Sequence, residues 1–240
     1  MGYKQDFIKF MVRSGVLTFG DFITKSGRPT PYFVNTGNYR TASQISTLGT
    51  YYAACVVENV EEFDLMYGPA YKGIPLVTTT AVSMWRDYEK DVPYCFNRKE
   101  AKDHGEGGSI VGAKPKDGDK VIIIEDVITA GSSVRESVPI LKGAADVDIT
   151  SLIISVDRME AGVNGISAIQ EIKEQYGIVT CPIVNTLEII DTLWNTPVDG
   201  KVYIDDAMTA LRSAPPLLRR SRAPVPLDPG RPECFRRDRR

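Results

Sequence analysis

Residues Val121 to Ser137, VIIIEDVITAGSSVRES, determine the predicted fold. Four β-branched apolar residues come first, followed by two adjacent carboxylates, Glu125 and Asp126, and then by a run of small and hydroxyl residues. A short apolar run bounded by turn residues is typical of a buried β-strand, and the residues after Gly131 have helical character. The stretch therefore predicts a strand that ends in two acids and leads through a tight turn into a helix.

The same strand-then-helix pattern recurs along the chain from about residue 64. Short apolar runs alternate with segments of helical character, which is typical of a parallel sheet covered by helices on both faces. We therefore expect an α/β fold with an open, mostly parallel sheet and a small N-terminal hood. The runs are FDLMYG (63–68), VPYCFN (92–97), KVIIIED (120–126), ITSLIISVDR (149–158) and IVTCPIV (178–184), and the helical segments are 73–88, 131–144, 164–176 and 185–193.

The chain divides into three predicted parts. Residues 1–40 hold an amphipathic helix around 7–12 and a hairpin-like hood, and residues 41–213 form the α/β core, with a further helix over 48–60. Residues 214–240 contain eight arginines, three acids and six prolines without any helical or strand period. Such a segment cannot bury enough apolar surface to offset its conformational entropy, so we expect a disordered basic tail.

Composition excludes several classes of protein. The apolar runs fall well short of a membrane span, and the N-terminus lacks a signal-like apolar segment, so we expect a soluble, cytoplasmic protein. The four cysteines are scattered, without a Cys-x-x-Cys pair and with a single histidine, which indicates reduced thiols rather than a protein-built metal site. The net charge of −2 gives no general affinity for nucleic acid.

The turn after the two acids suits a phosphate. In open α/β sheets, ligands bind outside the carboxyl ends of the strands, and backbone N–H groups at the start of a helix bind anions. A structural alternative is that Ser132 or Ser133 only caps the helix, with Glu136 completing a capping box with Ser133. Two carboxylates beside a phosphate site are explained if they face neutral hydroxyl groups or a metal on the same ligand. That ligand would be a sugar phosphate.

The opening stretch resembles the phosphoribosyl diphosphate (PRPP) motif of the type I phosphoribosyltransferases. The resemblance implies that Glu125 and Asp126 hold the ribose hydroxyls of PRPP, and that the following loop holds its 5′-phosphate. The loop residues are Val127, Ile128, Thr129, Ala130, Gly131, Ser132 and Ser133.

Residues 68–75, GPAYKGIP, resemble the pyrophosphate loop of the same family. The resemblance places Tyr71 and Lys72 at the diphosphate. Taken alone, a lysine in a turn rich in Gly and Pro is an ordinary surface residue. Its position after a predicted strand of the same sheet favours the functional interpretation.

Residues 97–112, NRKEAKDHGEGGSIVG, carry clustered cations next to three glycines. Such a composition suits either an arm that closes over a highly charged anion or a solvated surface loop. The string is very similar to the catalytic loop of the orotate phosphoribosyltransferases. That likeness implies a homodimer that shares loop 98–108 between subunits, with Arg98, Lys102 and His104 acting across the interface and Lys99 acting in its own subunit.

Residues 24–37, TKSGRPTPYFVNTG, resemble the N-terminal hood of the same family. By this match the orotate-binding residues are Lys25, Phe33, Val34, Thr129 and Arg158. A ring that carries a carboxylate calls for cations and a planar apolar cover. Two positions depart from the family pattern: Val34 stands where some members have a second Phe, and Glu125 where others have Asp.

The resemblance implies an orotate phosphoribosyltransferase, which converts orotate and PRPP to orotidine 5′-monophosphate and pyrophosphate in pyrimidine synthesis. The expected catalytic residues are Lys102, Asp126, Glu125 and His104. Mg²⁺ would be carried by PRPP, without direct protein ligands. Two alternatives are a phosphoribosyltransferase for another base, such as a purine, and a non-catalytic regulator that senses nucleotides and binds nucleic acid. A third is a plain α/β domain whose loops have no ligand.

Overall fold

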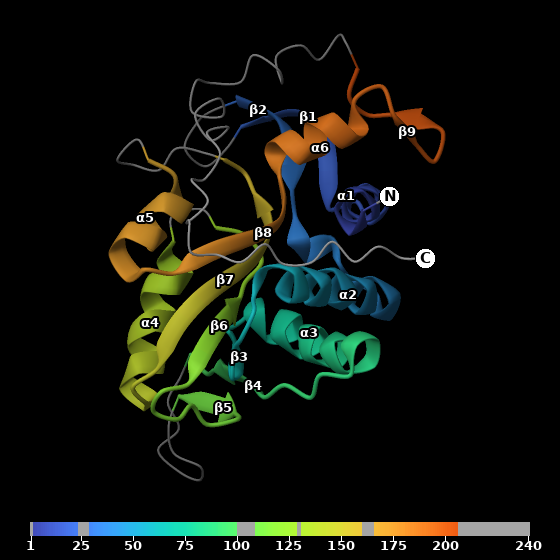
Figure 1. Cartoon of the computed structure of the whole chain (residues 1–240). Helices are drawn as coiled ribbons and strands as arrows, with labels where there is room; N and C mark the ends of the chain where they lie inside the picture. The colour runs from blue at the N-terminus through green and yellow to red at the C-terminus, as the bar shows by residue number, and fades with distance from the viewer. Residues whose placement is uncertain (1, 24–28, 100–108, 129–130, 160–165, 206–240) are drawn as a thin grey trace, which may run out of the picture.

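A computed structural model describes residues 2–23, 29–99, 109–128, 131–159 and 166–205 of the chain. These residues form one large sheet between two layers of helices, with a smaller hairpin at one end (Figure 1). Within the described part of the chain, no helix has both the length and the apolar character needed to cross a membrane.

The large sheet has six strands in the order β5-β4-β3-β6-β7-β8. All neighbouring strands are parallel except β4 and β5, which pair antiparallel at one edge. This confirms the fold class expected from the alternating runs. The strands are β3 (Leu65–Gly68), β4 (Tyr94–Asn97), β5 (Ile110–Gly112), β6 (Lys120–Ile124), β7 (Asp148–Asp157) and β8 (Val179–Asn185).

Strand β6 is apolar throughout because both of its faces are covered. Successive side chains of a strand point to opposite faces of the sheet. Ile122 and Ile124 lie in the apolar cluster under α2 (Ala42–Asn59) and α3 (Gly73–Tyr88). Val121 and Ile123 lie in the cluster under α4 (Ser132–Ala144) and α5 (Ala168–Tyr176), on the other face (Figure 1). All four side chains are fully buried, which fixes the point where the following acids emerge.

The predicted helices match those of the structure closely, with two differences. The helix expected over 48–60 begins earlier, at Ala42, because Thr41 and Gln44 form a capping box. The helix expected from 164 is described only from Ala168, where the Ser167 side chain accepts a hydrogen bond from the Gln170 N–H. Both starts depend on side-chain caps rather than on apolar periodicity.

The N-terminal part supplies a hairpin at the carboxyl end of the sheet. It comprises α1 (Tyr3–Arg13), β1 (Leu17–Ile23), β2 (Pro29–Val34) and the 3-10 turn η1 (Thr36–Asn38). Strands β1 and β2 pair antiparallel, as the expected hood requires. Helix α1 packs against α6 (Thr186–Leu193), which directly follows β8, and the short strands β9 (Pro197–Val198) and β10 (Lys201–Val202) complete this end. The boundaries at residues 40 and 213 stay predictions, and the tail 214–240 lies outside the described residues.

Helices α2 and α3 approach closely at Gly49. A Cβ atom added to Gly49 would lie 2.5 Å from both the backbone oxygen and the hydroxyl of Thr79 on α3. Only glycine leaves room for this approach, so the position of α3 relative to α2 depends on it.

We expect Gly49→Ala to lower the free energy of unfolding by about 1–3 kcal/mol, because the added methyl group must push the two helices apart. Gly143→Ala is the matched control, since Gly143 is also helical, is exposed, and has open space where the Cβ would lie. The control should be neutral or stabilising by up to about 1 kcal/mol. Urea unfolding of both variants measures the difference, and equal shifts in the two would contradict the assignment.

Candidate active site at the carboxyl ends of the strands

Glu125 and Asp126 are held in place through their backbone carbonyls. The Tyr52 hydroxyl, on α2, donates to the Glu125 carbonyl oxygen at 2.8 Å. The Ser155 hydroxyl and N–H, on β7, donate to the Asp126 carbonyl oxygen at 2.6 and 2.9 Å. Both acids are only 6% exposed. Their direction is therefore set by elements on both sides of the strand end.

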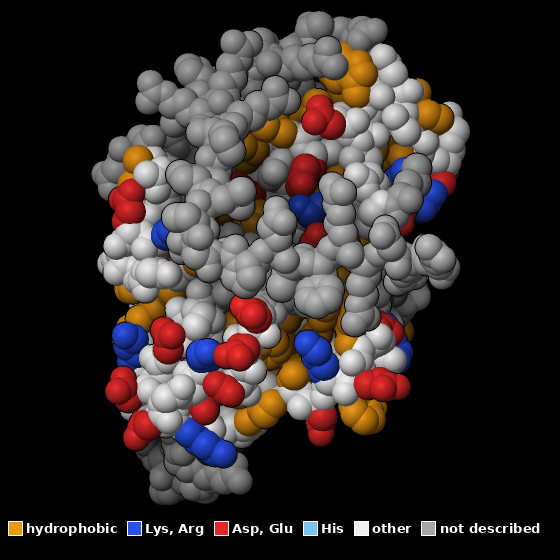
Figure 2. Space-filling view, in the orientation of Figure 1, with side chains coloured by type: hydrophobic (Ala, Val, Ile, Leu, Met, Phe, Trp, Pro, Cys, Tyr) orange, Lys and Arg blue, Asp and Glu red, His pale blue; other side chains and the backbone are white. Residues whose placement is uncertain are grey.

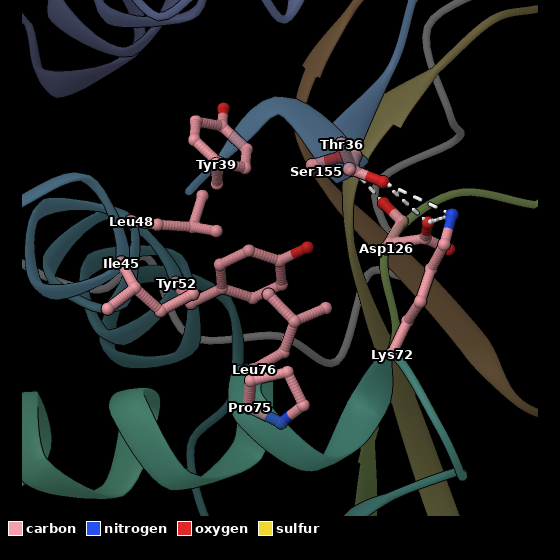
Figure 3. A pocket seen from close by; sticks show the side chains of 11 residues that line it. Thr36, Tyr39, Ile45, Leu48, Tyr52, Lys72, Pro75, Leu76, Asp126 and Ser155 are labelled. Atoms are coloured by element: carbon pink, nitrogen blue, oxygen red, sulfur yellow. Dashed lines mark hydrogen bonds and ion pairs between the residues drawn. The ribbon is translucent and has the colours of Figure 1, made fainter. Parts of the chain in front are cut away.

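The Asp126 carboxylate accepts three hydrogen bonds. Its Oδ1 accepts from the Val127 N–H at 2.7 Å, and its Oδ2 accepts from the Thr36 hydroxyl at 2.8 Å and from the Lys72 ammonium at 2.7 Å (Figure 3). Burial by itself would raise the pKa of Asp126, but the bonds from Lys72 and Thr36 and the charge of Lys72 outweigh burial and lower that pKa. Asp126 is therefore ionised at neutral pH.

Glu125 differs from its neighbour. Its Oε1 accepts a hydrogen bond from the Asp126 N–H at 2.9 Å. Burial raises the pKa of Glu125 to about 7, and the adjacent Asp126 charge adds to the effect. The two neighbouring acids thus have opposite pKa shifts, one ionised and one close to its titration point near neutral pH.

The loop after β3 brings a lysine to the acids. Gly68 and Gly73 are in contact, and a Cβ on either would collide with the loop backbone, so the turn can close only with glycines. The Ala70 N–H donates to Asn97 Oδ1 at 2.8 Å, which ties the loop to the end of β4, and the Ala70–Tyr71 peptide is cis. Lys72 then points back over the strand end toward Asp126.

A second cation lies at the end of the neighbouring strand. The Lys99 Nζ lies 5.5 Å from the centre of the Tyr71 ring. Tyr71 is 69% exposed, so this pair lies at the surface beside Lys72. The loops after β3 and β4 therefore gather positive charge on one side of the acids.

The turn before α4 is open to an anion. Helix α4 begins at Ser132, and its N-cap is Gly131 in the left-handed conformation, with φ of 69° and no side-chain cap. The alternative in which Ser132 or Ser133 caps this helix, with Glu136 in a capping box, is wrong. Ser132 and Ser133 lie inside the first turn, where backbone N–H groups lack intrahelical acceptors and are suited to a phosphate.

A cavity of about 180 Å³ lies beside Asp126 and Lys72. Thr36, Lys72, Asp126 and Ser155 form its polar side (Figure 3). The remaining wall is apolar or aromatic and comes from η1 and the facing sides of α2 and α3. It is formed by Gly37, Tyr39, Ile45, Leu48, Tyr52, Pro75 and Leu76.

This geometry agrees with the comparisons with known proteins. The phosphoribosyl transferase domain family matches residues 36–174. The chain is 55% identical over 205 residues to an orotate phosphoribosyltransferase of Clostridium beijerinckii, a match that covers 85% of this chain and 92% of that protein. A second relative, from Clostridium acetobutylicum, is 54% identical over 207 residues, covering 86% and 92%.

The chain belongs to the orotate phosphoribosyltransferase family. A solved orotate phosphoribosyltransferase of Francisella tularensis superimposes with a TM-score of 0.75 at 35% identity, covering 87% of this chain and 96% of that one. The fold, family and enzymatic activity expected from the sequence are thereby confirmed.

The hood residues alternate in their exposure along β2. Phe33 is 42% exposed and packs on Phe22 of β1, with ring centres 5.6 Å apart. Val34 packs instead against the main apolar cluster. Since neighbouring strand residues face opposite sides, the Phe33 ring remains partly exposed while the Val34 side chain contributes to the core.

Arg158 lies at the end of β7, at the boundary with the hood. Together with Ile128, Asp157 and Ser167 it lines a small recess at the ends of the sheet strands. The hydroxyls of Tyr32 on β2 and Thr186 at the start of α6 are 2.8 Å apart, and the Thr186 hydroxyl donates to the carbonyl oxygen of Asp157, the residue before Arg158, at 3.4 Å. This contact joins the hood to the strand end that carries Arg158.

The predicted site residues are only partly described. The structure brings together Lys72, Glu125 and Asp126, and it places Tyr71 and Lys99 beside them. Arg98 stands where the loop leaves β4, and its N–H donates to the Ser109 carbonyl at 2.7 Å. The remaining predicted residues, Lys25, Lys102, His104, Thr129 and Ala130, lie outside the described residues.

Four residues of the site were missed in the sequence. Thr36, Tyr52, Asn97 and Ser155 orient the acids and the pyrophosphate loop through hydrogen bonds. Thr36 lies in the stretch 24–37 and Asn97 in the stretch 97–112, both of which resemble the family. A threonine or an asparagine by itself, however, gives no sign of a role in a binding site. Tyr52 and Ser155 belong to strongly apolar segments. In the sequence, the hydroxyl group of each residue is the one sign that it makes a hydrogen bond inside the protein.

The pKa of Glu125 makes stability depend on pH. The folded protein keeps the Glu125 proton up to about pH 7, whereas an unperturbed Glu loses it near 4.5. The stabilising contribution of this group is therefore present below pH 4.5 and is lost as the pH rises to 7. Glu125→Gln cannot ionise, so the free energy of unfolding of this variant should rise relative to that of the wild type by about 3 kcal/mol between pH 4.5 and 7, and the difference should level off above pH 7.

Urea unfolding at several pH values measures this difference. Glu61→Gln is the control, because Glu61 is exposed. A constant difference between wild type and Glu125→Gln from pH 4.5 to 8 would show that Glu125 ionises normally in the folded protein.

Proposed function

We propose that Glu125 and Asp126 bind the ribose hydroxyls of PRPP while this enzyme transfers its phosphoribosyl group to orotate. The Asp126–Lys72 pair carries the proposal, because it places a fixed carboxylate and a mobile cation at the ends of adjacent strands. The carboxylate suits neutral hydroxyl donors, and the cation suits the diphosphate attached to the same sugar. The open first turn of α4 lies next along the chain and suits the 5′-phosphate, with Val127, Ile128, Thr129, Ala130, Gly131, Ser132 and Ser133 forming its loop.

Departure of pyrophosphate from the anomeric carbon develops negative charge on the leaving group and positive charge on the ribose. Lys72, with a side chain 63% exposed, can turn from Asp126 toward the diphosphate, and Lys99 lies beside Tyr71 on the same side. Arg98, Lys102 and His104 of the loop would add further cations. Asp126, and Glu125 when ionised, would offset the positive charge on the ribose.

Orotate would lie between the hood and the end of β7. Phe33 offers an exposed aromatic face, and Arg158 offers a cation for the carboxylate. Lys25, Thr129 and the backbone of Val34 complete the proposed base site. Water would be excluded when loop 98–108 closes.

Mg²⁺ fits this site as an ion that arrives with PRPP. Within the described residues, no group of three His, Cys, Asp or Glu side chains could hold a metal. Mg²⁺ prefers phosphate oxygens and waters with few carboxylates, and Asp126 is the carboxylate residue among those that line the cavity. When bound, the ion would neutralise charge on the leaving diphosphate.

We further propose a cytoplasmic homodimer. On α3, Val82 and Trp85 are 57% and 61% exposed and lie one helical turn apart. A pair of large apolar side chains on one helical face is suited to contact with a second copy. Loop 98–108 starts and ends at the β4–β5 edge, and in the proposed dimer it reaches the partner's site.

The regulator that binds nucleic acid receives no support from the face of the molecule drawn in Figure 2. Figure 2 shows acidic and basic side chains mixed over this face, without a continuous basic area among the described residues. Binding to a phosphate backbone calls for clustered Lys and Arg. The basic segment 214–240 lies outside the described residues, so the expectation of no nucleic-acid partner stays a prediction.

Purified protein with PRPP and Mg²⁺ should consume orotate, followed as loss of orotate absorbance, and should leave uracil and adenine unchanged. EDTA should abolish turnover, and added Mg²⁺ should restore it, because the diphosphate needs charge neutralisation to leave. Turnover of adenine would favour a purine enzyme. Saturable PRPP binding without any turnover would favour the regulator.

Mixed dimers test whether the loop acts across the interface. Lys102→Ala should lower kcat by about 100-fold or more if Lys102 contacts the leaving group as charge develops. Asp126→Asn removes the carboxylate that would bind the ribose. In the proposed dimer, this carboxylate and Lys102 of the same site come from different subunits. Mixing the two inactive variants, with subunit exchange, should restore about one quarter of wild-type turnover, since each hybrid has one site with both intact residues. Without recovery in verified hybrids, the loop acts within its own subunit.

A further inference from the structure

Thr36 connects the hood to the two charged residues of the PRPP site. It is the first residue of η1 and is separated from the end of β2 by one residue, Asn35. Its Oγ1 donates to Asp126 Oδ2 at 2.8 Å and accepts from Lys72 Nζ at 3.3 Å (Figure 3). One hydroxyl group thus contacts both members of the ion pair.

The backbone around Thr36 is fixed independently of those charges. The Asn35 N–H donates to the Val16 carbonyl at 2.8 Å, and the Asn35 side chain accepts from the Gly37 N–H at 3.1 Å. The Asn38 side chain donates to the Gly15 carbonyl at 2.7 Å. Because both neighbours of Thr36 are anchored, the backbone that carries its hydroxyl is held next to Asp126 without any contribution from Lys72.

The three donors to the Asp126 carboxylate are not equivalent. The Val127 N–H serves Oδ1, while Thr36 and Lys72 both serve Oδ2. Lys72 is a long and largely exposed side chain, whereas the other two donors belong to anchored backbone segments. If Lys72 leaves, each carboxylate oxygen still keeps one neutral donor, and the plane of the carboxylate is retained.

We propose that Thr36 is a positioning residue for PRPP, which holds the Asp126 carboxylate in its ribose-binding orientation while Lys72 turns to the diphosphate. The inference rests on the proposed roles of Asp126 and Lys72. Without the Thr36 hydroxyl, departure of Lys72 leaves Oδ2 without a protein donor among these three. The carboxylate can then rotate away from the ribose.

Thr36→Val and Thr36→Ser separate the hydroxyl from the shape of the side chain. Valine keeps the branched shape and loses the hydroxyl, and serine keeps the hydroxyl and loses the methyl group. A hydrogen bond to a charged group is among the stronger ones, so Thr36→Val should raise the KM for PRPP by about 10-fold. Its kcat should change by less than about threefold, because the ribose carboxylate acts in both the ground state and the transition state.

Thr36→Ser should keep the KM for PRPP within about threefold of wild type, since the donor is retained. The KM for orotate should change little in either variant. A purely structural role would instead lower kcat through loss of active protein, or would affect both variants alike. Either pattern would overturn the inference, and a thermal melt of each variant identifies loss of folded protein.

Asp126→Asn and Lys72→Ala distinguish this inference from the proposed function. If these two variants leave PRPP binding and turnover unchanged, the assignment of the PRPP site is wrong and Thr36 has nothing to position. If they impair PRPP use while Thr36→Val behaves as wild type, the site assignment stands and the role of Thr36 is wrong.

Discussion

The placement of two carboxylates at the end of a fully buried strand is the constraint on which the rest of this structure depends. Glu125 and Asp126 follow four residues with no exposed surface and are themselves almost buried. Buried carboxyl groups are costly unless they are hydrogen-bonded or paired. Thr36 and Lys72 meet this requirement at the Asp126 carboxylate, and Tyr52 and Ser155 hold the backbone carbonyls of the two acids. The segment after β2, the start of α3, α2 and β7 therefore converge on one point.

The same constraint separates the two acids chemically. Asp126 has a cation and two further donors, and its pKa falls. Glu125 is buried beside a charge of its own sign, and its pKa rises to about 7. Adjacent residues of nearly the same chemistry therefore have opposite pKa shifts, and pairs of this kind are characteristic of functional sites.

The order of strands and helices was predictable because it depends on local patterns. The helix over 73–88 has the expected bounds, since apolar spacing and flanking turn residues determine both of its ends. The alternative in which Ser132 or Ser133 caps α4 was wrong, because a left-handed Gly131 is the N-cap and the two serines are the first residues of the helix. The donors to the acids were not predictable. These donors lie between 29 and 90 residues from the acids in the chain, and only the packed fold brings donors and acids together.

The proximity of Gly49 and Tyr52 on helix α2 connects folding to chemistry. Gly49 sets how closely α2 and α3 pack, and Tyr52, about one turn later on α2, supports the carbonyl of Glu125. Lys72 is the N-cap residue of α3. A substitution between these two helices is therefore expected to disturb the proposed PRPP site as well as the packing. A mutational scan would find residues that never touch a substrate and still behave as part of the active site.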